Sequence, residues 1–161
     1  MKTNLNILYI IIYKMTIMTA NGAISYLANI FGRDICDWVK LAHKYNCEKN
    51  GWNYTPLQSR CFGYDNLAIS LYHVFSNTNF KKLLKEKNVE ELASLVHEGW
   101  CINYIYWRDN KPYEKNTLYI KPFAELGDDV RNFCAITAYK DLPEGQKEKD
   151  RIIARFILEN L

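Results

Sequence analysis

The stretch YKDLPEGQKEKDRIIARFIL, residues 139–158, carries the clearest helix start in the chain. Pro143 fits the first turn of a helix, where its missing N–H costs nothing, and Asp141 is placed to accept hydrogen bonds from unpaired backbone N–H groups. Glu144 complements the positive end of the helix dipole. The apolar residues that follow recur at helical spacing and predict a buried stripe: Ile152, Ile153, Phe156, Ile157 and Leu161. We therefore predict a C-terminal helix that docks onto a core.

A second helix is predicted to begin at Asn88. Asn88 is a favoured N-cap residue, and Glu91 three positions later completes the pattern of a capping box. Leu92, Leu95 and Val96 then lie on one side of a helix. We expect this helix to continue through NYIYW, residues 103–107, and to end at RDNKP.

Three further segments of the N-terminal half have helical character. Residues 23–31 predict a short helix, and a second one opens near Asp34 and stops at Asn50-Gly51. The segment from Asp65 to Phe75 fits a helix or a strand, and its spacing favours a helix. The basic KKLLKEK that follows, residues 81–87, predicts a solvated helix face, with a phosphate or acidic-partner site as the alternative.

The sequence after the second predicted helix does not indicate a single type of secondary structure. LYIKPF, residues 118–123, predicts a short strand, and VRNFCAITAY, residues 130–139, is apolar enough to be buried. The fold class that follows from all segments is mainly α, with at most short β segments.

Two motifs in this order resemble the RyR domain, the small repeat named after ryanodine receptors. A Tyr, then Leu-Pro, a charged stretch with Lys, Asp-Arg and an apolar helix is similar to the closing half of that domain. Its opening half has a helix bearing His-Glu with an aromatic residue close behind, as in LASLVHEGW, residues 92–100. The resemblance covers about residues 88–161 and implies a helix–loop–helix domain.

The resemblance has departures that bear on the domain organisation. The connection 101–138 is longer than is usual in the family and lacks its Gly-Trp-x-Tyr-Gly-Pro element, whereas a similar GWNYTP occurs earlier, at residues 51–56. We predict an N-terminal tail or apolar segment at 1–22, a helical region at 23–87 and the RyR-like domain at 88–161. Region 23–87 has a degenerate RyR-like unit as its alternative interpretation.

The resemblance implies a non-enzymatic, regulatory binding module for a nucleotide-like small molecule. The candidate ligand-binding residues are His97, Glu98, Trp100, Tyr139, Asp150 and Arg151. Four of them have a structural alternative. His97 caps or hydrogen-bonds the facing helix, Asp150 and Arg151 form an internal ion pair in place of phosphate binding by Arg151, and Trp100 takes a core position. Lys147 is expected to be solvated.

A protein–protein interaction module is the alternative function, with exposed aromatic residues at 104–107 and Tyr113 as its contact patch. No nucleophile elbow, P-loop, Rossmann glycine pattern or metalloprotease motif occurs in the sequence. Cys101 lies four residues after His97, a Cys–His spacing that we attribute to chance. We therefore predict no catalytic residue and no cofactor.

The composition suits a folded chain that does not bind nucleic acid. The 161 residues are 48% hydrophobic and 14% aromatic, and the net charge is only +3, with Lys and Glu alternating instead of forming a basic stripe. Heavy use of Asn, Ile, Lys and Tyr, whose codons are AT-rich, indicates a genome bias, viral or from an AT-rich microbe. We expect a cytoplasmic protein, in the host cytoplasm if it is viral.

The five cysteines predict reduced thiols, since their number is odd and no CxxC occurs. They are Cys36, Cys47, Cys61, Cys101 and Cys134. A zinc site from Cys36, His43, Cys47 and Cys61 is the alternative, but the spacings match no standard zinc pattern. No metal site is predicted.

The N-terminal apolar run from Ile7 to Tyr13 is too short to span a bilayer, and Lys14 interrupts it. A poorly ordered or extended tail is favoured. Membrane association through residues 5–17 and a signal peptide are the open alternatives.

Overall fold

The computed structural model describes residues 20–31, 35–54, 62–110 and 129–161. Within these ranges the protein is mainly helical and contains no strand, which confirms the predicted fold class. The expected strand at 118–123 lies outside them, and so do residues 1–19 of the tail expected at 1–22, whereas residues 20–22 of that tail begin a helix. The elements are α2 (Ala20–Phe31), α3 (Ile35–Asn50), α4 (Phe62–Phe75), α5 (Phe80–Lys85), α6 (Val89–Asn110), α8 (Asp129–Ala135), the 3-10 turn η2 (Tyr139–Asp141) and α9 (Glu144–Asn160).

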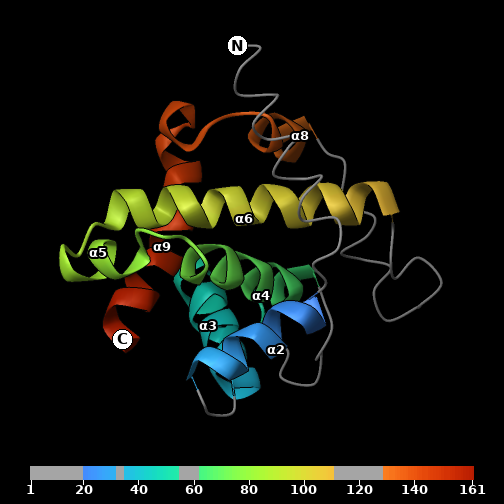
Figure 1. Ribbon diagram of the computed structural model, residues 1–161. Coiled ribbons are helices and arrows are strands. Elements are labelled where there is room, and N and C mark those ends of the chain that lie inside the picture. Colours follow the sequence, from blue (N-terminus) through green and yellow to red (C-terminus); the bar gives the residue numbers. More distant parts are fainter. Residues whose placement is uncertain (1–19, 32–34, 55–61, 111–128) are drawn as a thin grey trace.

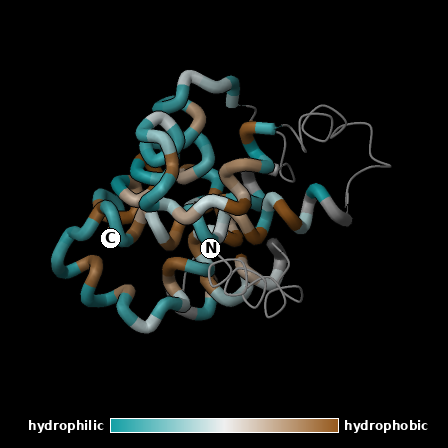
Figure 2. Tube along the Cα trace, turned by 90° about the horizontal axis from the view of Figure 1, so that it is seen from above, coloured by the Kyte–Doolittle hydropathy of each residue, from teal (hydrophilic) through white to brown (hydrophobic). Residues whose placement is uncertain are grey.

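Helix α6 is the central element and contacts α4, α5, α8, η2 and α9 (Figure 1). Helix α4 lies along one side of α6, whereas α8 and η2 lie on the opposite side. Helix α9 crosses α6 and also contacts α3, and α2 and α3 pack on α4. Figure 2 shows polar and apolar residues alternating along the helices, as expected of amphipathic segments that each bury one face.

One hydrophobic core joins the two predicted regions. Leu27, Val39 and Leu71 belong to the same buried cluster as Val96 and Phe156. Residues 23–87 therefore pack directly on the C-terminal part. The division of the chain into two domains near residue 88 stays a prediction. No helix in the described part of the chain is both long and apolar enough to cross a membrane.

Helices α4 and α6 approach each other closely at Gly99. A Cβ atom at this position would lie 2.6 Å from the Cα atom of Ser70, closer than real Cβ contacts allow. Leu67 and Leu71 of α4 and Val96 of α6 are fully buried near this crossing. The segment after Asp65 is thus a helix, as its spacing favoured, and the missing side chain at Gly99 permits its contact with α6.

The connection between α5 and α6 ends one helix and caps the next. Lys87 has a positive φ of 51°, and the N–H groups of Lys87 and Asn88 donate to Leu84 and Leu83, as in a Schellman motif. The side chain of Asn88 accepts a hydrogen bond from the N–H of Glu91 at 3.1 Å, which confirms the predicted cap. The reciprocal bond of a capping box is not formed, because the N–H of Asn88 already donates to Leu83.

The start of α9 differs from the prediction. Pro143 is the N-cap, with φ −57° and ψ 147°, and its carbonyl accepts from the N–H groups of Gln146 and Lys147. Asp141 does not cap this helix. It lies in η2, and the extended residues Leu142 and Pro143 separate it from the first helical turn.

The apolar stripe of α9 is mostly as predicted. Ile152, Ile153, Phe156 and Ile157 are buried, whereas Leu161 is exposed because the helix ends at Asn160.

Helix α8 buries less of its apolar surface than the sequence indicated. Cys134 and Ala135 are buried, but Val130, Phe133 and Ile136 are 57%, 48% and 63% exposed. The expectation that residues 130–139 are buried therefore holds at Cys134, Ala135 and Tyr139 and is wrong at the three exposed residues, because only one face of a short helix meets α6.

Candidate functional site

A pocket of about 460 Å³ lies between α6 and the chain that links α8 to η2. Three of the predicted ligand-binding residues, His97, Glu98 and Tyr139, line it. Trp100 and Arg151 are not among its lining residues, and neither is Asp150. The lining residues are Glu90, Glu91, Ser94, His97, Glu98 and Cys101 of α6, residues 135–140, and Lys147 of α9.

His97 lies in the pocket wall and links its own helix, α6, to α9 and to the 136–138 turn. Its Nδ1 lies 3.3 Å from Oδ2 of Asp150 on α9, and its Nε2 lies 2.8 Å from the carbonyl oxygen of Thr137. Because both oxygens accept hydrogen bonds, this arrangement favours a ring that carries a proton on each nitrogen. The expected hydrogen bond from His97 to the facing helix is therefore present, together with a second one to the 136–138 turn.

The protonation of His97 follows from these contacts. Its side chain is only 5% exposed, and burial alone lowers its pKa. The hydrogen bonds with Asp150 and Cys101 outweigh burial and raise the pKa of His97 to about 11. His97 is thus an imidazolium at neutral pH.

Asp150 and Arg151 have separate partners. Asp150 is buried against His97; burial raises the pKa of this carboxyl group, and the contact with His97 opposes that shift. Arg151 points to a different side of α9, since adjacent helical residues do not share a face. The internal Asp150–Arg151 ion pair that the sequence suggested is not formed, because both groups pair with residues of α6. Asp150 pairs with His97, and Arg151 pairs with Glu90.

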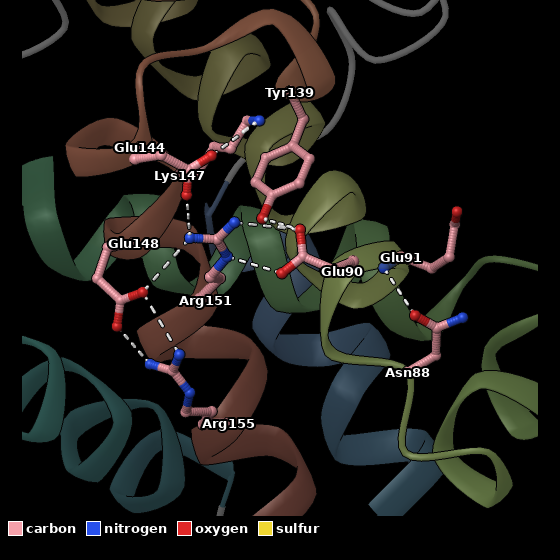
Figure 3. A network of polar contacts seen from close by, with 9 residues as sticks. All are labelled: Asn88, Glu90, Glu91, Tyr139, Glu144, Lys147, Glu148, Arg151 and Arg155. Atoms are coloured by element: carbon pink, nitrogen blue, oxygen red, sulfur yellow. Dashed lines mark hydrogen bonds and ion pairs between the residues drawn. The ribbon is translucent and has the colours of Figure 1, made fainter.

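Arg151 holds carboxylates from two helices (Figure 3). Its Nε donates to Oε1 of Glu90 at 2.7 Å, and its Nη1 donates to Oε2 of Glu144 at 2.8 Å and lies 3.7 Å from Glu148. The hydrogen bonds from Arg151 lower the pKa values of Glu90 and Glu144. The planar fork that would bind a phosphate faces carboxylates instead, so the geometry lends no support to phosphate binding by Arg151.

Tyr139 forms the wall of the pocket nearest this network. Its hydroxyl donates to Oε2 of Glu90 at 3.0 Å, and Nζ of Lys147 lies 5.9 Å from the centre of its ring. Burial, and then the bond to Glu90, raise the pKa of Tyr139 to about 12. Lys147 also bonds to Glu144 at 3.2 Å and is only 16% exposed, so its expected solvation is wrong.

Glu98 lies at the edge of the pocket that faces α4, whereas Trp100 does not line the pocket. Glu98 lines the pocket and accepts from Nε2 of His73 on α4 at 2.7 Å. The ring of Trp100 stacks between His97 and Tyr104, with centroid distances of 6.0 and 5.0 Å, and packs against the core. The core interpretation of Trp100 is the one that the structure supports.

Several pocket residues were not among the candidates, although the sequence holds a signal for them. Glu90, Ser94, His97 and Cys101 are spaced by four, three and four residues, so they share one face of α6. This stripe of polar residues on one face of α6 marks the pocket wall. Thr137 and Lys140 carry no comparable signal, because their position depends on how the 136–138 turn folds back.

Cys47, Cys101 and Cys134 are buried free thiols, in agreement with the reduced state expected from the sequence. Sγ of Cys47 lies 3.9 Å from the ring nitrogens of His43, so these two residues share a helix face. Across the described ranges, no three His, Cys, Asp or Glu side chains are grouped in a way that could hold a metal ion. The zinc alternative also needs the Cys36 and Cys61 side chains, which lie outside the described residues.

No family model, curated protein or solved structure matches this chain. The resemblance to the RyR domain therefore rests on the two sequence motifs and their order.

Proposed function

We propose that this chain is a non-enzymatic, RyR-type binding module whose ligand is a small polar molecule held in the pocket between α6 and residues 135–140. The observation that carries the proposal is that His97, Glu98 and Tyr139, which come from the two separate motifs, line one pocket. The other motif residues act behind it, since Asp150 holds His97 and Arg151 holds Glu90. Both motifs thus serve one pocket.

The charges on the pocket wall narrow the ligand class. Glu91 and Glu98 offer carboxylate oxygens that accept hydrogen bonds from N–H and O–H groups of a ligand. Lys140 and Lys147 supply positive charge, but Lys147 is bonded to Glu144 and the Arg151 guanidinium is held by carboxylates. Within the nucleotide-like class, this pattern favours a nucleoside or a monophosphate over a polyphosphate, because the base and sugar supply the donors and few cations remain for phosphates.

A thermal-shift panel on the full chain tests this proposal. Nucleosides, their monophosphates and their triphosphates are compared at one concentration, since a ligand that binds only the folded state raises the melting temperature. Glu91→Gln changes the pocket wall, and Glu86→Gln on α5 is the matched control outside it. A nucleoside shift that is reduced by Glu91→Gln and kept by Glu86→Gln supports the proposal. A folded chain that no member of the panel stabilises contradicts it.

A protein-interaction module is the second candidate, and the exposed apolar side chains of α8 and of the residue that follows it favour it. Val130, Phe133 and Ile136 are about half exposed or more, which is unusual for three neighbouring apolar residues. The aromatic patch expected at 104–107 is wrong at Tyr104, which is fully buried and donates to Asn132 at 2.8 Å. Tyr106 is 38% exposed, whereas the Trp107 side chain and Tyr113 lie outside the described residues.

A pull-down with matched variants tests this second function. Phe133→Ser with Ile136→Ser removes apolar surface from α8 and from the residue that follows it, and Leu41→Ser removes an equally exposed leucine from α3. A partner retained by Leu41→Ser and lost by the α8 double variant supports interaction through α8. Equal retention by both variants contradicts it.

A further inference from the structure

An exposed apolar face borders the pocket on the side of α8. It consists of Val130 and Phe133 on α8 and of Ile136 directly after the helix, and we call these three side chains the α8 face. They are spaced by three residues, as on one side of a helix. Ile136 also lines the pocket, so the α8 face continues into the pocket rim. A contiguous apolar surface beside a polar rim is typical of a site that another segment covers.

The carboxylates at the pocket rim face solvent, and the guanidinium that binds them lies beneath. The side chains of Glu90 and Glu144 are 58% and 73% exposed, whereas Arg151, which bonds to both, is 17% exposed. Glu91 is also exposed and lines the pocket, and the exposed Lys140 lies on the opposite wall. The rim on the α6 side therefore presents negative charge. A segment that complements both surfaces carries a cation next to apolar residues.

Residues 1–19, which lie outside the described ranges, contain a segment of this kind. The seven apolar residues Ile7–Tyr13 are followed directly by Lys14. Within the chain the alternative is the shorter run Leu118–Ile120, which is followed by Lys121. Because the free energy gained by burial is roughly proportional to apolar area, the seven-residue run gains more from covering the α8 face than the three-residue run does.

The chain between this run and α2 is long enough to reach the α8 face. Helix α2 packs on α4, which lies along one side of α6, and α8 lies on the opposite side (Figure 1). The path therefore crosses about two helix diameters, or roughly 20–24 Å. Ile10, in the middle of the run, is ten residues before Ala20, and ten extended residues span up to about 35 Å. The run can therefore meet the α8 face while α2 keeps its place.

We propose that residues 7–14 dock on the α8 face of their own chain, with Lys14 beside the exposed carboxylates of Glu90 and Glu91. Both apolar surfaces leave water in this one contact. Attachment to the same chain gives the run an effective concentration in the mM range, which favours it over a separate molecule. A protein partner then reaches α8 only after it displaces residues 7–14, so the docked run regulates that surface. The docking uses the pocket rim but does not require the ligand of the proposed function.

Photo-crosslinking of the full chain tests this docking. Phe133 is replaced by the photoreactive p-benzoylphenylalanine, which keeps the aromatic ring, and the crosslinked peptides are mapped by mass spectrometry after irradiation. We expect crosslinks from position 133 to residues 7–14 within one chain. Crosslinks confined to residues 111–128, crosslinks that join two copies of the chain, or the absence of any crosslink overturn the proposal. The same probe at Val130 replaces the first one if circular dichroism shows that the Phe133 variant is not folded.

Leu41 on α3 supplies the matched control for the probe, because it is an exposed apolar residue outside the α8 face. The probe at position 41 should give no crosslink to residues 7–14. Equal crosslinking from positions 41 and 133 would show that the run contacts exposed surface without preference, and this result also overturns the proposal.

Charge variants test the place of Lys14. Lys14→Glu should lower the crosslink yield from position 133 by about two- to five-fold, the size of effect expected of an exposed ion pair. Lys2→Glu changes the net charge equally and should have a smaller effect, and adding Glu91→Lys to Lys14→Glu should restore part of the yield. Equal effects of Lys14→Glu and Lys2→Glu overturn the contact of Lys14 with the rim. A nucleoside shift without the crosslink overturns this inference alone, whereas the crosslink without any shift counts against the proposed function alone.

Discussion

His97 and Asp150 form a buried contact between α6 and α9, with Nδ1 of the imidazole 3.3 Å from Oδ2 of the carboxylate. The pair comes from two sequence motifs that are separated by α8 and η2. Its position ties the pocket wall to the C-terminal helix, so its protonation state is coupled to the stability of the fold.

The free energy of unfolding should fall as pH rises above neutrality. The folded state keeps the proton of His97 up to a pKa of about 11, whereas the unfolded chain releases it near 6.5. The stabilisation is thus complete below about pH 6.5 and is lost as pH rises towards 11, with a slope of up to about 1.4 kcal/mol per pH unit. Urea unfolding at about pH 7 and about pH 8, followed by circular dichroism, measures this slope.

The control for the pH dependence is Asp150→Asn, which should flatten the slope because it removes the carboxylate that holds the proton on His97. Burial lowers the pKa of His43, which acts with the opposite sign, but that titration is nearly complete in both states above about pH 7. A stability that rises between the two pH values would contradict the assignment of His97 as an imidazolium.

Gly99→Ala should destabilise the protein by about 1–2 kcal/mol. The new Cβ meets the Cα of Ser70 at 2.6 Å, and such overpacking outweighs the gain in helix propensity. Gly145→Ala is the matched control, since nothing lies within 4 Å of its Cβ and α9 gains an alanine. Urea midpoints of the two variants should move in opposite directions, and equal shifts would show that α4 and α6 do not meet at Gly99.

Asn88→Ala should cost about 1 kcal/mol of stability, because the N–H of Glu91 loses its side-chain acceptor. Asn79→Ala makes the same chemical change at the N-cap of α5, where no side-chain cap bond is formed, and should have a smaller effect. The measurement is the urea midpoint of each variant. Equal losses would indicate that the effect comes from asparagine itself and not from capping.

Arg151→Met should lower the melting temperature more than Arg155→Met does. Arg151 joins Glu90 on α6 to Glu144 on its own helix, whereas Arg155 bonds to Glu148 within α9. The difference should shrink in high salt, because these side chains reach solvent and salt screens them. A difference that high salt leaves unchanged would point to packing of the Arg151 stem instead of its charge.

Helix placement was largely readable from the sequence, and side-chain partners were not. The spacing of apolar residues, Asn88 and Gly51 located the helices, since these signals are local. Arg151 and Asp150 were expected to pair with each other because they are adjacent in the chain. Their partners come from α6 and from the preceding turns of α9, and the packing angle of the two helices decides which of them each side chain meets.

Part of the site could also be predicted from the sequence, because its motifs are local signals. His97, Glu98 and Tyr139 were found through the two motifs, and they do line the pocket. Thr137 was missed, because the geometry of the link between α8 and η2 brings its carbonyl to His97. The Cys101–His97 spacing was visible, and it places Sγ of Cys101 at 3.4 Å from Nε2 of His97.

The close approach at Gly99 also limits which positions of the protein can change their residue during evolution. The crossing with Ser70 fixes the rotation of α6 about its axis, and Glu91 and Ser94 lie on its pocket side. Positions 70 and 99 can therefore tolerate only small residues, whereas positions 91 and 94 can change without disturbing the helix pair. Natural variation that changes ligand preference should therefore accumulate at positions 91 and 94, while positions 70 and 99 keep small residues.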